Sequence, residues 1–89
     1  MKSHTTKRFR KAYAQLPERV RRQAREAYKL FVQNPHHPGL RFKQVHRTRS
    51  IYSVRIAIDY RAIGVREGDQ IVWFWTGTHA EYDQIISRL

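Results

Sequence analysis

The chain contains no cysteine among its 89 residues, which excludes a disulfide framework, a thiolate zinc site and a thiol nucleophile. Glycine and proline are few, at 4 and 3 residues, and neither an internal repeat nor a low-complexity tract occurs. No apolar run approaches the length of a bilayer span, and the basic segment 1–11 lacks the apolar core of a signal peptide. We therefore expect a cytoplasmic protein with no membrane partner.

Acidic residues are also scarce: 7 Asp and Glu stand against 18 Lys and Arg, for a formal net charge of +11. Residues 1–49 hold 14 of the basic residues and only two acidic ones, Glu18 and Glu26. Arginine outnumbers lysine by 13 to 5, and its forked guanidinium binds phosphate with two parallel hydrogen bonds. This one-sided basic character predicts a polyanionic partner. The alternative is a basic surface that serves only solubility.

A chain of this length is expected to form one domain, residues 1–89, with a small hydrophobic core. Thr5 or Thr6 can cap a first helix that runs to about Leu16, and Pro17 suits the first turn of a second helix. The segment 34–39, Asn-Pro-His-His-Pro-Gly, ends that helix. Helical spacing places the apolar residues of the two helices on one stripe of each: Phe9, Tyr13 and Leu16 on the first, and Val20, Ala24, Ala27, Tyr28 and Phe31 on the second.

The second half of the chain predicts a sheet. Gly68-Asp69 signals a hairpin, and the segment 72–75 is apolar on both faces, which predicts a central strand with Trp73 and Trp75 in the core. The last residues predict a short helix with Tyr82, Ile85, Ile86 and Leu89 inward. Four strands are expected, over Leu40–His46, Ile51–Ile58, Tyr60–Glu67 and Gln70–Thr76. The predicted fold is α+β: an N-terminal helical hairpin packed on a four-stranded, mainly antiparallel sheet, with a short C-terminal helix.

Two arginines, Arg55 and Arg61, interrupt strands that are otherwise apolar. With His79 and Tyr82 just beyond the last strand, they indicate an anion site, and the net charge makes a nucleic-acid phosphate the expected anion. Strand parity decides whether the two arginines share a face. A three-residue connection over 58–60 places them on one side of the sheet, whereas a two-residue turn separates them.

Further basic residues flank this site from the first expected strand and its loop: Arg41, Lys43, Arg47 and Arg49. We expect them to bind RNA phosphates without reading sequence, the alternative being a charged strand edge that prevents edge-to-edge pairing. Four other histidines lack the i, i+4 helical spacing of a zinc-binding pair: His4, His36, His37 and His46. We therefore expect no metal and no cofactor.

The order and spacing of several motifs resemble the RelE/ParE toxin superfamily of bacterial type II toxin–antitoxin systems, over nearly the whole chain. The motifs are Phe9-x-x-x-Tyr13 before Leu16-Pro17, N-P-x-x-P-x-L-R-F-K over 34–43, Y-S-V-R-I and Y-R-A-I within 52–63, and T-H-x-x-Y-D over 78–83. The resemblance implies a toxin neutralised by a cognate antitoxin. It further implies, for the RelE-like branch, a metal-independent endoribonuclease that cuts messenger RNA, commonly on the ribosome.

The same resemblance implies a role for each candidate residue. Arg61 would bind the scissile phosphate, Arg55 matches a basic position on the neighbouring strand, and both would stabilise the transition state. His79 would deprotonate the 2′-hydroxyl, since an imidazole titrates near neutrality. Tyr82 or the protonated His79 would serve the leaving 5′-oxygen. Ser53 stands where some members of the superfamily have a lysine, and no glutamate is placed as a strand base.

Plain structural roles remain as alternatives for the same residues. His79 would then be a solvated residue at a helix start, Tyr82 a core residue, and Arg61 the partner of Asp59 or Asp83 in a salt bridge. Two other functions also remain open: a ParE-like inhibitor of DNA gyrase, and a catalytically degenerate nucleic-acid-binding module. Neither needs Arg55, Arg61, His79 and Tyr82 as a set.

Overall fold

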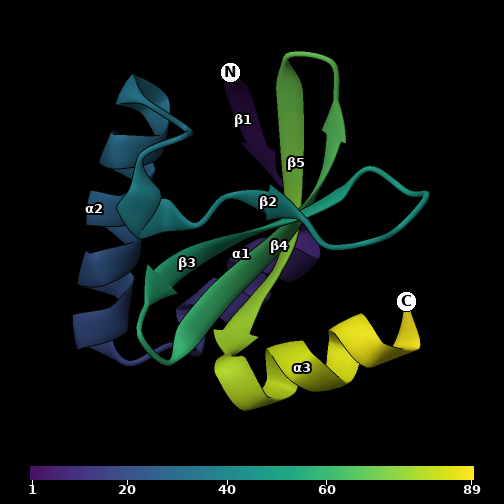
Figure 1. The fold of residues 1–89 in the computed structure, drawn as a ribbon. Coiled ribbons are helices and arrows are strands. Elements are labelled where there is room, and N and C mark those ends of the chain that lie inside the picture. Colours follow the sequence, from purple (N-terminus) through teal and green to yellow (C-terminus); the bar gives the residue numbers. More distant parts are fainter.

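The computed structural model describes residues 1–89 as three α-helices and one five-stranded sheet (Figure 1), and the α+β class is confirmed. The sheet order is β1-β5-β4-β3-β2; β1 runs parallel to β5, and all other neighbours are antiparallel. In chain order the elements are β1 (Lys2–Thr5), α1 (Lys7–Ala14), α2 (Glu18–Gln33), the 3₁₀ turn η1 (Pro38–Leu40), β2 (Lys43–Gln44), β3 (Ile51–Ala57), β4 (Tyr60–Glu67), β5 (Gln70–Thr78) and α3 (His79–Arg88).

The expectation of four strands is wrong by one, because β1 adds a parallel edge strand beside β5. Three of its four residues are exposed, so it shows no apolar pattern, and non-local bonds hold it in place. The main-chain N–H of Lys2 donates to the carbonyl of Asp69 (2.8 Å), and the indole Nε1 of Trp73 donates to Ser3 Oγ (2.8 Å).

The strand expected over Leu40–His46 is also wrong in its extent. Only Lys43 and Gln44 pair with β3, because the chain first makes the 3₁₀ turn η1. Arg41 then adopts a left-handed conformation with φ of 48°, which a strand cannot accommodate. As a result β2 covers only a short part of the outer edge of β3.

Two clusters of buried side chains lie on opposite faces of the sheet. Helices α1 and α2 pack on one face, and α3 lies on the other (Figure 1). The first cluster contains Phe31, Leu40, Val54, Ala62, Ile71 and Trp73, and the second contains Ile51, Ile63, Trp75 and Tyr82. Both tryptophans are core residues, as predicted. The inward position assigned to Leu89 is wrong, since this residue is 39% exposed, and Tyr28 on the apolar stripe of α2 is 51% exposed.

Helix α3 covers only part of its face of the sheet. Its apolar residues pack over the second cluster, where Ile51 and Ile63 are buried. Farther along the same two strands, Arg55 and Arg61 remain partly exposed. This uncovered end of the face is where the candidate site lies. No helix in the chain is long and apolar enough to cross a bilayer.

Candidate phosphate-binding site

Arg55 and Arg61 stand directly opposite each other on β3 and β4. The turn between the strands has two residues, 58 and 59, and such a turn alone would place the arginines on opposite faces. A β-bulge at Ile56 adds one residue to β3 and restores the shared face. The two arginines therefore share a face, although the connection is the two-residue turn that by itself would have separated them.

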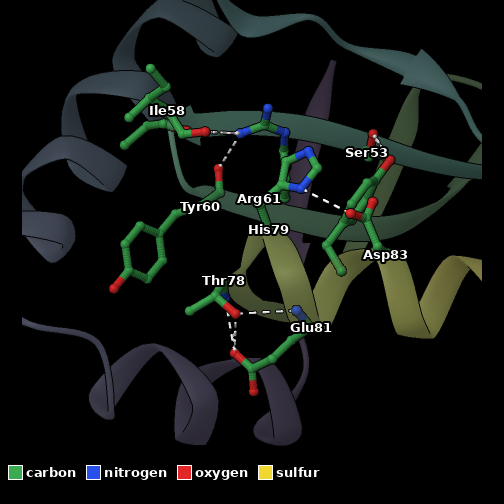
Figure 2. A network of polar contacts seen from close by, with 10 residues as sticks. Ser53, Ile58, Tyr60, Arg61, Thr78, His79, Glu81 and Asp83 are labelled. Atoms are coloured by element: carbon green, nitrogen blue, oxygen red, sulfur yellow. Dashed lines mark hydrogen bonds and ion pairs between the residues drawn. The ribbon is translucent and has the colours of Figure 1, made fainter.

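The guanidinium of Arg61 is hydrogen-bonded to the β3–β4 turn through a single nitrogen. Its Nη1 donates to three main-chain carbonyls, those of Ala57 (2.8 Å), Ile58 (3.3 Å) and Tyr60 (2.9 Å). Figure 2 shows that Nη2 points away from the turn. No carboxylate lies within ion-pair distance of Arg61, so the salt bridge considered with Asp59 or Asp83 is wrong. The side chain is thus fixed in position while Nε and Nη2 stay available to an anion.

Positive charges accumulate around Arg61. Burial of its guanidinium is the main reason that the pKa of Arg61 is lowered, and the charge of Arg55 is the next. Tyr82 and Asp83 act in the opposite direction, while Arg41 lowers the pKa further. Because arginine stays protonated in proteins, the cost is borne as lost hydration of the guanidinium and, next, as repulsion between like charges. A bound anion would remove that repulsion, so the arrangement favours phosphate binding.

His79 is the first residue of α3, and its ring pairs with Asp83 one turn further along the helix (Figure 2). The distance from Nδ1 to the Asp83 Oδ2 is 3.1 Å. Because a carboxylate only accepts hydrogen bonds, Nδ1 carries the proton, and Nε2 of the neutral ring is an acceptor. The His79 side chain is 44% exposed, so solvent reaches the ring. Sequence reasoning missed the role of Asp83, although the i, i+4 spacing was a visible signal.

The start of α3 is fixed by two sets of hydrogen bonds. The main-chain N–H of His79 donates to the carbonyl of Asp59 (2.7 Å), which joins the helix to the turn that also holds Arg61. Thr78 is the N-cap and forms a capping box with Glu81 (Figure 2). The hydrogen bonds from Thr78 lower the pKa of the Glu81 carboxyl. His79 therefore follows the cap and is not itself the capping residue.

Tyr82 is buried next to the exposed His79 ring. It is 9% exposed, and its hydroxyl donates to Oγ of the buried Ser53 at 3.0 Å. Its ring centroid is 5.6 Å from that of His79, so Tyr82 supports the imidazole from below. This burial favours the core role over proton transfer, because the hydroxyl proton is already engaged. Ser53 acts here as the partner that makes a buried tyrosine hydroxyl tolerable.

The four flanking basic residues divide into two pairs. The charge of Arg41 acts on Arg61, and Lys43 pairs with Ser53 across β2 and β3, so it shares the face of the site. Arg47 and Arg49 lie instead in the loop before β3, and β3 itself begins four residues before Arg55, or about 13 Å away along the strand. The structure brings only the first pair to the site. No group of three or more His, Asp or Glu side chains could hold a metal ion.

A family model described as the ParE-like toxin domain matches residues 18–84. No curated protein matches the sequence. Among solved structures, YafQ from E. coli strain BL21(DE3) aligns with a TM-score of 0.72 at 14% identity, covering 90% of this chain and 94% of that one. A chain of the RelB–RelE antitoxin–toxin complex from Methanococcus jannaschii gives 0.71 at 18% identity, with 92% and 96% covered. The YoeB/ParE toxin from Agrobacterium tumefaciens gives 0.65 at 14%, with 89% and 99% covered.

Proposed function

Because the chain belongs to the ParE-like toxin domain family, we propose that it is the toxin of a type II toxin–antitoxin pair and acts as a metal-independent endoribonuclease. The observation that supports this activity is the pairing of Arg55 and Arg61 on the face of the sheet that also carries α3 with His79. A phosphate held by the two guanidinium groups would lie at the end of the face where a base is also present. An inhibitor that acts only by binding its target protein needs no such base.

The proposed reaction is cleavage by the neighbouring 2′-hydroxyl. Nε2 of His79 accepts the hydroxyl proton, the 2′-oxygen attacks phosphorus, and the bond from phosphorus to the 5′-oxygen breaks. Arg55 and Arg61 stabilise the charge that develops on the phosphate oxygens. The protonated imidazole then supplies the proton to the leaving oxygen, because the Tyr82 hydroxyl is engaged with Ser53. The products are a 2′,3′-cyclic phosphate and a 5′-hydroxyl.

Messenger RNA is the proposed substrate, and the ribosome the proposed place of cutting. RNA follows from the mechanism, since DNA has no 2′-hydroxyl to deprotonate. The net charge of +11 supports binding to RNA phosphates, including those of ribosomal RNA. We place the protein in the cytoplasm for the same reason.

The proposed protein partner is a cognate antitoxin with acidic and apolar segments. Antitoxin–toxin complexes occur among the structural relatives, from Methanococcus jannaschii and Mycobacterium tuberculosis. An acidic chain would neutralise the basic surface and fold on binding, as disordered inhibitors do. Such a partner would prevent RNA from reaching the same arginines.

Inhibition of DNA gyrase is a second candidate, favoured by the ParE-like description of the matching family. The two functions differ in their need for His79, because a ribonuclease requires this base and a binding inhibitor does not. The test is inducible expression of the wild type and His79→Ala, with His36→Ala as a control because His36 is an exposed histidine of the loop after α2. Growth arrest with new messenger-RNA 5′ ends, both lost only in His79→Ala, supports the ribonuclease. Arrest without new ends that persists in His79→Ala contradicts it and points to gyrase.

A further inference from the structure

A groove of about 440 Å³ lies between α2 and the end of β3. From α2 it is lined by Arg19, Arg22 and Glu26, and from the sheet by Arg55 and Ile56. Arg19 and Arg22 are one helical turn apart and therefore lie on the same side of α2. Arginines from two separate elements thus converge on one open surface.

Arg55 belongs to this groove and to the candidate site at once. Strand β2 pairs only with Tyr52 and Ser53, so it ends before it reaches Arg55 on the outer edge of β3. The bulge at Ile56 interrupts the strand at the same point. No strand therefore pairs with β3 beside Arg55, and the groove begins there, with Gly39 and Leu40 of η1 also in its lining. A ligand bound opposite Arg61 can continue along this groove toward α2.

The three arginines of the groove have no protein partner. None of Arg19, Arg22 and Arg55 forms an ion pair, and none donates a side-chain hydrogen bond. The single acidic residue of the groove, Glu26, is bound to Lys29 at 3.3 Å. Positive charge that is not neutralised within the protein favours an anionic ligand that has several charges along its length.

We propose that this groove binds the backbone of single-stranded RNA next to the phosphate that is cleaved, with Arg19 and Arg22 each contacting one phosphate. The inference rests on the proposed ribonuclease function. It extends the RNA-binding surface from the candidate site to the groove beside α2. A flexible single strand fits the geometry because it must bend from the face of the sheet over the edge of β3. Guanidinium contacts to phosphates position the strand and read no bases. The groove therefore adds affinity without sequence preference.

The test compares two double variants that each remove two positive charges. Arg19→Gln with Arg22→Gln changes the groove, whereas Arg8→Gln with Lys11→Gln changes exposed residues of α1 that lie outside it. Affinity for a 12-nucleotide 2′-O-methyl RNA, which is not cleaved, is measured by fluorescence anisotropy over a series of salt concentrations. Circular dichroism checks that both variants keep the helical content of the wild type.

Each phosphate contact on a single strand contributes about 0.7 to the slope of log affinity against log salt. Loss of two contacts should therefore reduce the slope by about 1.4 and weaken binding about 25-fold at 0.1 M salt. The α1 variant should lose less than about threefold, because it removes no direct contact. A dinucleotide with a single phosphate should bind the wild type and the groove variant equally.

Equal losses in the two double variants, or an unchanged groove variant, would overturn the inference. The outcome is separable from the fate of the ribonuclease, because the RNA in the binding assay cannot be cut. If the wild type cleaves no RNA but the groove variant still loses affinity, RNA binding in the groove is supported and the proposed ribonuclease function fails. If the wild type cleaves RNA and the groove variant binds normally, only the groove inference fails.

Discussion

Replacing Arg61 by alanine should abolish most of the activity while leaving the fold nearly as stable as before. In the structure this guanidinium uses Nη1 to bind three carbonyls of the β3–β4 turn and leaves Nε and Nη2 for a phosphate. Arg61→Lys is the informative companion, because lysine retains the charge but cannot bind the turn and a phosphate in the same forked geometry.

The expected magnitudes follow from these contacts. Loss of a donor to the transition-state oxyanion typically costs about 2.7–4 kcal/mol, or 10²–10³ in rate. Loss of the turn contacts costs about 1–2 kcal/mol of stability, as for hydrogen bonds from a charged donor. The repulsion from Arg55 and Arg41 that Arg61 experiences is removed at the same time and offsets part of this cost. The net change in the free energy of unfolding should therefore stay below about 1.5 kcal/mol.

Single-turnover cleavage of RNA and unfolding in urea, measured on the same preparations, test this reasoning. Arg61→Ala should lose at least about 100-fold in rate, and Arg61→Lys should lie between it and the wild type. A rate within about threefold of the wild type would remove Arg61 from the site. A loss of stability above about 3 kcal/mol would mean that Arg61 is a structural residue and that the activity loss follows from unfolding.

Four further predictions concern the groups around the base. Asp83→Asn should slow cleavage about tenfold at unchanged stability, measured by single turnover, because the amide holds the imidazole less firmly in one tautomer. Tyr82→Phe should leave the cleavage rate within about threefold but cost about 1–2 kcal/mol in urea unfolding, because Ser53 loses its partner; a 100-fold slower rate would restore Tyr82 as the acid. Thr78→Ala should cost about 1 kcal/mol through the lost cap. The folded state lowers the pKa of Glu81, so its stabilising effect is complete above the ordinary carboxyl pKa and disappears as pH falls through the lowered value. The urea midpoints of wild type and Glu81→Gln should therefore converge on acidification, and a constant difference would contradict the capping box.

The helices and the last hairpin could be predicted because short-range signals specify them. Thr6 accepts the hydrogen bond from the N–H of Phe9 at the start of α1, as a capping residue does. Gly68 supplies the positive φ of 58° that the turn before β5 requires. Trp73 and Trp75 are buried because β5 lies between two other strands.

The pairing of strands could not be predicted in the same way. Strand β1 depends on contacts with Asp69 and Trp73, nearly 70 residues away in sequence, and carries no apolar alternation of its own. The sequence of this apolar strand carries no signal of the bulge at Ile56, yet the bulge alone brings Arg55 opposite Arg61. The candidate residues could thus be chosen by type from sequence, whereas their shared face required the three-dimensional register.

Most hydrogen-bond partners of the candidate residues could likewise not be predicted from the sequence. Arg61 binds carbonyls of a turn rather than a carboxylate, and main-chain acceptors have no signature in side-chain patterns. The buried bond between Tyr82 and Ser53 joins residues 29 positions apart. Only the pair of His79 and Asp83 had a local signal in its helical spacing.

The most direct test of the account is the chemistry of the RNA ends produced by the purified protein on messenger RNA in a translating extract. Fragments from the wild type and from His36→Ala should carry 5′-hydroxyl ends and matching 2′,3′-cyclic phosphates, and His79→Ala should produce none. These ends require attack by the 2′-oxygen, which is the step assigned to His79. Fragments with 5′-phosphates, or identical fragments from His79→Ala, would contradict the mechanism.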